Sequence, residues 1–196
     1  MANRQEELME ATFHLVAEEG LYGLTLKKVA AAVGVSETLV YKYFRNKEEL
    51  LYSCFEMVHK DIGRLCAQIP APEGSSIEYC LNYAHTLWLR YFDLLISEGE
   101  RTLFYFIYRD SPYIKTIQEG DAVARTSYFK KFADTFISMR ETLDLEHKMD
   151  ADFFWAYVLD TTGIFARRFI RGELPDTPES RETVWKMIYA GLSWLA

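Results

Sequence analysis

Apolar residues recur along this chain with the period of an α-helix from one end to the other. Between positions 8 and 16 they share one helix face, and Gly20 is expected to end that first helix. No stretch alternates apolar and polar residues as a half-buried strand does. The pattern therefore predicts an all-α protein of about nine helices.

Two short helices are predicted in the first quarter of the chain. Thr25 is expected to cap a helix of residues 26–33, which Gly34 closes. Ser36 is expected to cap a second helix that continues through Phe44. Two helices of this length joined by so short a turn have the dimensions of a helix-turn-helix.

Longer helices are predicted over the rest of the chain. Asn46 caps the first of them, and a Pro-rich and Gly-rich loop ends it near residue 70. The remaining helices are expected over residues 77–96, 100–110, 113–142 with Gly120 as a point of interruption, 150–171 with Gly172 as its stop, and 179–196.

The helix-turn-helix interpretation makes demands on particular positions. Ala30 is small where the two helices cross, and Gly34 suits a turn that requires a positive φ. Apolar contacts inside the head are expected from Val29, Val33, Val35, Val40 and Tyr43. An ordinary helical hairpin remains the alternative.

Charge is distributed unevenly in a chain whose net charge is −7. Residues 25–47 contain five basic side chains and one acidic side chain, Glu37, whereas residues 1–24 contain five acidic side chains and one basic. The basic residues are Lys27, Lys28, Lys42, Arg45 and Lys47. Phosphate contacts need only the face that meets a duplex, so this local excess is compatible with an acidic protein.

Residues 25–50 resemble the DNA-binding head of TetR-type transcriptional regulators. The resemblance is carried by Gly-Val-Ser at 34–36, Tyr-x-Tyr-Phe at 41–44 and Asn-Lys-Glu-Glu-Leu at 46–50. It implies a helix-turn-helix head of residues 1–46 and an effector-binding and dimerisation body of residues 47–196. The helix of residues 47–69 would connect the two.

The resemblance also implies contacts with double-stranded DNA. The expected DNA-binding residues are Thr25, Lys27, Ser36, Glu37, Thr38, Tyr41, Lys42, Tyr43 and Lys47. Thr25 would bond a phosphate at a helix N-terminus, and Lys42 would face the major groove on the recognition helix. Phe44 is expected to pack inside the head. Residues 38–40 depart from the family pattern, so no base preference is carried over.

Aromatic residues crowd the region from Tyr79 to Trp155, and 103–108 are all apolar. Six such residues surround a helix, so part of them must face a cavity or another chain. The middle helices of the family enclose an effector site, which implies a small, mainly apolar or aromatic ligand here. The candidates are Val58, Ile62, Tyr83, Leu87, Trp88, Tyr91, Phe104, Tyr108, Phe129, Phe132 and Trp155. Core packing is the alternative for each.

The last two helices have apolar faces that a small body would struggle to cover. The resemblance implies a homodimer with a two-fold contact through these helices and hence a palindromic operator. The candidate interface residues are Tyr157, Ile164, Arg168, Trp185, Ile188, Tyr189 and Leu192.

The rest of the composition argues against other classes of protein. The three cysteines form no C-x-x-C pair, and no metal or cofactor is expected. Motifs typical of enzymes are absent, including a G-x-S-x-G elbow and an H-E-x-x-H pair. No apolar run reaches membrane-spanning length, so we expect a cytoplasmic protein. A regulator that answers to a protein partner or to no ligand is the main alternative, and an enzyme the more distant one.

Overall fold

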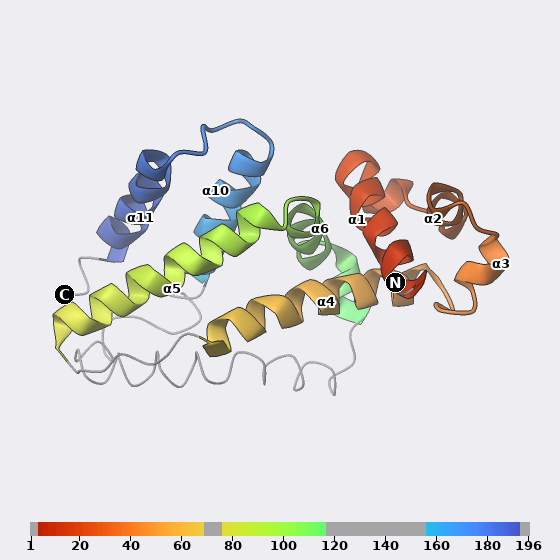
Figure 1. The fold of residues 1–196 in the computed structure, drawn as a ribbon, viewed down its shortest axis with the longest axis horizontal. Coiled ribbons are helices and arrows are strands. Elements are labelled where there is room, and N and C mark those ends of the chain that lie inside the picture. The colour runs from red at the N-terminus through yellow and green to blue at the C-terminus, as the bar shows by residue number, and fades with distance from the viewer. Residues whose placement is uncertain (1–3, 69–75, 117–155, 193–196) are drawn as a thin grey trace. The chain divides into compact units, whose positions relative to one another are not determined.

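Helices make up the regular secondary structure of residues 4–68, 76–116 and 156–192, which the computed structural model describes (Figure 1). The α-helices are α1 (Arg4–Gly23), α2 (Leu26–Val33), α3 (Glu37–Val40), α4 (Lys47–Gln68), α5 (Ile77–Ser97), α6 (Glu100–Arg109), α10 (Thr161–Ile170) and α11 (Pro178–Leu192). A 3-10 turn, η1 (Pro112–Thr116), follows α6, and a π-helical turn, η2 (Ala156–Asp160), precedes α10. The all-α prediction is confirmed, and the eight α-helices of the described residues are close to the expected nine.

The predicted ends of α2 and the predicted start of α4 are confirmed at the level of hydrogen bonds. The Thr25 hydroxyl accepts the N–H of Lys28 at 3.2 Å, and Gly34 ends α2 with a φ of 71°. The Asn46 side-chain oxygen accepts the N–H of Glu49 at 2.8 Å where α4 begins. These caps act over three or four residues, which is why the sequence alone reveals them.

Two predicted ends differ in the structure. Gly20 breaks the helical geometry with a φ of 75°, yet α1 resumes and ends at Gly23. The second short helix was expected to run to Phe44, but α3 ends at Val40 and a turn covers residues 41–43. This turn is tightened by hydrogen bonds between residues three positions apart in the sequence. One of them is the 2.9 Å bond from the Tyr43 N–H to the Val40 carbonyl. Ser36 supplies no side-chain cap bond.

Other predicted helices lie only partly within the described residues. The helix expected at 113–142 is described only in its first residues, where η1 is found, and the start of the helix expected at 150–171 is outside them. None of the helices that can be described combines the length and the apolar character needed to cross a membrane.

The chain divides into two compact units. The first contains the described residues 4–61 and 98–116, and the second contains 62–68, 76–97 and 156–192. Helix α4 therefore contributes residues to both units.

The core of the first unit joins α1, α4 and α6 through aromatic rings. Phe13 and Phe104 meet edge to face at 5.2 Å, and both are fully buried. Phe55 of α4 lies parallel to Tyr105 of α6 at 5.1 Å. Arg101 adds a surface link between α6 and α1, because it binds Glu10.

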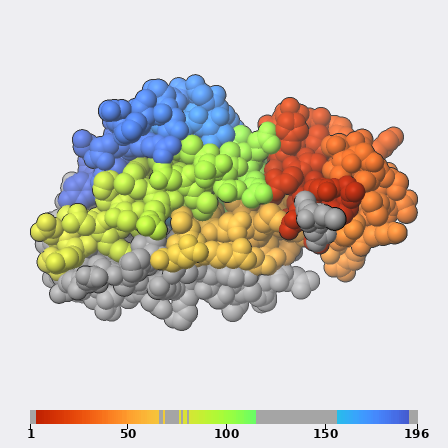
Figure 2. Space-filling model, in the orientation of Figure 1, coloured from red at the N-terminus to blue at the C-terminus, as the bar shows by residue number. Residues whose placement is uncertain are grey.

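The core of the second unit lies where α5 packs against α10. Helix α11 adds Trp185, whose ring lies 5.5 Å from that of Trp88 on α5, and Figure 2 shows α5 beside α10 and α11 on the surface. The indole N–H of Trp88 donates to the hydroxyl of Thr162 at 3.0 Å, and both residues are buried. Phe92 meets Phe169 edge to face at 5.4 Å. A buried indole N–H needs such a partner, so this bond fixes how α5 and α10 face each other.

Candidate nucleic-acid interface

Helices α2 and α3 meet in a tight turn with a buried inner side. The N–H of Val35 donates to the Ala30 carbonyl at 2.9 Å, and the N–H of Gly34 donates to the Ala31 carbonyl at 3.1 Å. Ala30 is 3% exposed, so the small side chain lies at a close approach inside the head. Phe44 is 1% exposed and packs inside the head as expected. The local geometry is that of a helix-turn-helix.

The outer side of the same helices carries the residues expected to meet DNA. Eight of these nine residues are exposed: Thr25, Lys27, Ser36, Glu37, Thr38, Tyr41, Lys42 and Tyr43. Tyr41 is 53% exposed and Tyr43 is 37% exposed, so the phenol groups are accessible although their rings are large and apolar. The head therefore presents hydroxyls and ammonium groups together on its surface.

Only part of the local positive charge is available to a ligand. Lys28 binds Glu19 and also donates to the Gly23 carbonyl at 2.9 Å. Arg45 pairs with Glu49 at 3.2 Å. Lys27 and Lys42, by contrast, have no partner within the part of the chain that the structure describes. These two ammonium groups can neutralise phosphates without breaking an existing contact.

Comparison with known proteins identifies this head. Residues 8–54 match the family profile of bacterial regulatory proteins, tetR family. A TetR family transcription regulator from Marinobacter aquaeolei VT8 has the same fold, with a TM-score of 0.77 over 95% of this chain and 93% of that chain at 17% sequence identity. Residues 8–54 therefore carry the N-terminal domain of tetR-family regulatory proteins.

Two curated relatives match the TetR head in sequence. The nucleoid occlusion factor SlmA of Photorhabdus laumondii is 34% identical over 61 residues, which are 31% of this chain and 31% of the relative. The fatty acid metabolism regulator protein of Bacillus subtilis is 34% identical over 50 residues, which are 26% of each chain. The matched segments thus span about a third or less of these relatives.

Lys47 differs from the other expected DNA contacts of the TetR head. Its ammonium donates to the Leu21 carbonyl at 2.6 Å and lies 5.8 Å from the centre of the Tyr113 ring. Burial lowers the pKa of Lys47. The Leu21 carbonyl thus uses one of the three N–H donors of the Lys47 ammonium, and the expected phosphate contact of Lys47 stays a prediction.

Thr25 keeps its capacity to donate at the first turn of α2. Its hydroxyl oxygen accepts the Lys28 N–H, which leaves the hydroxyl proton available for an anion. The helix dipole of α2 favours an anion at the same end. The geometry is compatible with the phosphate role that the TetR resemblance implies for Thr25.

The candidate effector residues of this chain are distributed over both units. Val58, Phe104 and Tyr108 are buried in the first unit. Ile62, Tyr83, Leu87, Trp88 and Tyr91 are buried in the second unit. Phe129, Phe132 and Trp155 lie outside the described residues. Several of the buried rings pack on other rings, as Phe104 does on Phe13, so their pocket role stays a prediction.

The candidate dimer residues fall into an inner and an outer set. Ile188 is fully buried, and the Tyr157 hydroxyl donates to the carbonyl of Met187 at 3.4 Å within the same chain. Ile164 is 49% exposed and Tyr189 is 38% exposed. Arg168 is exposed, and its Nε lies 3.9 Å from a carboxylate oxygen of Glu173. The Trp185 ring stacks on the His85 ring at 4.8 Å. The side chain of Leu192 is outside the described part.

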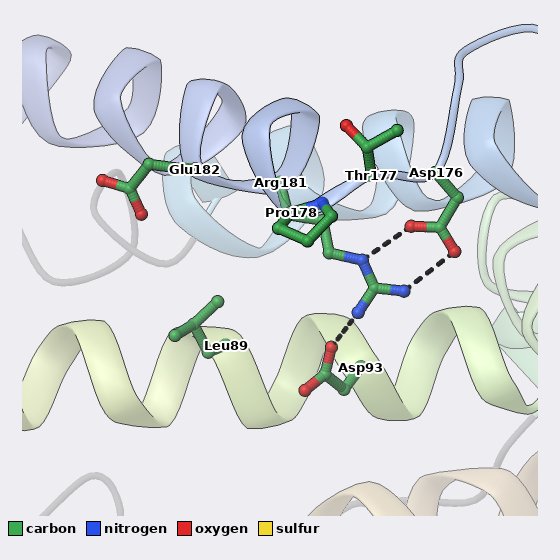
Figure 3. A pocket seen from close by; sticks show the side chains of 7 residues that line it. All are labelled: Leu89, Asp93, Asp176, Thr177, Pro178, Arg181 and Glu182. Carbon is green, nitrogen blue, oxygen red and sulfur yellow. Dashed lines mark hydrogen bonds and ion pairs between the residues drawn. The ribbon is translucent and has the colours of Figure 1, made fainter.

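A hollow of about 510 Å³ lies between α5 and the start of α11, where no candidate residue had been placed (Figure 3). Its lining residues are Leu89, Asp93, Asp176, Thr177, Pro178, Arg181 and Glu182. Arg181 crosses this hollow and donates to both carboxylate oxygens of Asp176, at 2.6 and 2.8 Å, and to Asp93. These bonds hold the pKa of Asp176 below its usual value. The guanidinium of Arg181 is thus already paired with carboxylates. The charged lining of this hollow also differs from the aromatic effector site expected from the sequence.

Tyr22 is an exposed residue of the TetR head that is missing from the DNA-binding residues expected from the sequence. Its side chain is 81% exposed, the largest exposed fraction among the exposed large hydrophobic residues of the described chain. The available signal is its position between Gly20 and Gly23, because glycines mark where a helix kinks and ends.

Proposed function

We propose that the protein is a homodimeric transcriptional repressor that binds a palindromic operator in double-stranded DNA and is released by a small, mainly apolar or aromatic effector. The observation that carries this proposal is the exposed face of α2 and α3, where Lys27 and Lys42 are unpaired within the described residues. Exposed hydroxyls of Tyr41 and Tyr43 complement them, since phenol groups also bond phosphate oxygens. The protein would act in the cytoplasm, where the chromosome is accessible.

Exposed apolar side chains support the dimer. Ile164 on α10 and Met187 on α11 are 49% and 54% exposed. Both lie in the second unit, on the helices that the family resemblance assigns to the dimer contact. A dimer would place two recognition helices about 34 Å apart, so that they enter successive major grooves.

An effector would act by binding the state that does not fit DNA more tightly than the state that does. Helix α4 supports this proposal because it begins next to the helix-turn-helix and contributes residues to both units. Buried aromatic residues such as Trp88 and Tyr91 make an apolar ligand the favoured class. A panel of aromatic compounds is expected to contain one that raises the melting temperature and weakens DNA binding. If none does both, the repressor answers to another signal.

Binding to the DNA directly upstream of the protein's own gene tests the DNA-binding role. We expect Lys27→Ala to weaken binding to this duplex and to a random-sequence duplex by the same factor. In a dimer, the slope of log K against log salt should become less steep by about 1.8, since each phosphate contact contributes about 0.9. Fluorescence anisotropy over a salt series measures both quantities.

The matched control is Lys186→Ala. Lys186 is also exposed, with 73% of its side chain accessible, but it lies on α11. It should leave the salt slope unchanged. If wild-type protein binds neither duplex, or if Lys27→Ala and Lys186→Ala behave alike, the proposed DNA interface is wrong.

A further inference from the structure

Tyr22 is displayed on the head by the way α1 ends. Gly20 leaves the helical conformation with a φ of 75°, which kinks α1 before its last turn, residues 21–23. Leu21 and Leu24 on either side of Tyr22 are 3% and 1% exposed, whereas Tyr22 is 81% exposed. The neighbours anchor this turn in the core and leave the phenol group outside.

Two lysines hold the backbone on both sides of Tyr22. The Lys47 ammonium donates to the Leu21 carbonyl at 2.6 Å, and the Lys28 ammonium donates to the Gly23 carbonyl at 2.9 Å. The carbonyl before Tyr22 is thus bonded from α4 and the carbonyl after it from α2. A side chain on so well-anchored a turn loses little backbone freedom when it binds a partner.

The same bonds place Tyr22 beside the surface proposed to meet DNA. Lys28 lies in the first turn of α2, which Thr25 caps, and Lys47 is the first residue of α4. Lys28 also binds Glu19, so the acidic group closest to this turn in the sequence is neutralised. The Tyr22 hydroxyl makes no hydrogen bond within the described residues. The Tyr22 hydroxyl is thus an exposed hydrogen-bond donor without a partner among the described residues, and lysines lie beside it. Such a group suits the phosphate backbone of DNA better than an apolar protein surface.

We propose that Tyr22 is a further DNA contact, whose hydroxyl donates to a phosphate oxygen flanking the segment met by α3. This inference rests on the proposed function and extends its interface from the helix-turn-helix to the end of α1. A phenol contact differs from a lysine contact because it is neutral. It adds affinity without adding to the number of counterions released.

Replacing Tyr22 with phenylalanine in the full-length protein tests the contact. We expect Tyr22→Phe to weaken binding about tenfold or more, because a hydrogen bond to a charged group is lost in each half of the dimer. The factor should be equal for the upstream duplex and a random-sequence duplex. The salt slope should equal that of the wild type, unlike the slope of Lys27→Ala. The melting temperature should not change, since the hydroxyl is exposed.

Tyr79→Phe is the matched control, because Tyr79 is 55% exposed but lies on α5 in the second unit. It should bind both duplexes as the wild type does. If Tyr22→Phe also binds like the wild type while Lys27→Ala binds more weakly, the Tyr22 contact is wrong and the proposed function stands. If the wild type binds neither duplex, the proposed function fails and the Tyr22 contact with it.

Discussion

Replacing Phe104 with alanine is expected to lower the free energy of unfolding by about 3–5 kcal/mol. Phe104 is fully buried in α6 and meets Phe13 of α1 edge to face at 5.2 Å. The substitution removes the transfer free energy of the ring and leaves a cavity that the aromatic neighbours fill only in part. Urea denaturation followed by circular dichroism measures the loss.

Ile107→Ala on the same helix is the control, because Ile107 is only half-buried and its loss should be smaller. The pair of variants also separates core from pocket. A Phe104→Ala protein that keeps its stability and loses its response to an effector would show that the ring lines a ligand cavity. In that case the core assignment of Phe104 is incorrect.

Ile164→Glu is expected to separate the proposed dimer and to weaken operator binding by ~100-fold or more, since linked heads gain that much from avidity. Ile164 is 49% exposed within one chain, so a charge there costs the monomer little. Across a dimer interface the same charge would be buried without a partner. Sedimentation velocity measures the change in mass, and fluorescence anisotropy measures the change in affinity.

Thr86→Glu introduces the same charge at an exposed position of α5 in the same unit and should leave the dimer intact. A dimer that survives Ile164→Glu would place the contact elsewhere on the chain. A monomeric wild type would refute the homodimer itself.

Local signals in the sequence were sufficient wherever the interacting groups are close along the chain. Thr25 and Asn46 cap helices by accepting N–H groups three residues away, and Gly34 ends α2 through its own positive φ. Both conclusions require only the preferences of single residues and their neighbours. The early end of α3 at Val40 was missed because bonds in the following turn compete with the helical pattern.

The roles of the charged and aromatic residues could not be settled by composition. The sequence shows five basic residues at positions 25–47 but not which of them remain unpaired. Lys47 is bonded to Leu21, which lies 26 residues earlier, so its partner follows from the packing of α4 on the end of α1. In the same way, Phe104 meets Phe13 from a distant part of the sequence, which makes it a core residue of the first unit.

The sequence by itself determined the helical class, the helix-turn-helix and the resemblance of the head to the tetR family, because periodicity, caps and a short motif are local properties. Only the tertiary structure decided that Lys27 and Lys42 are unpaired among the described residues and that Tyr22 is exposed. Whether a side chain is available to bind DNA depends on its burial and on its pairing with other groups. Both follow from how distant parts of the chain pack together.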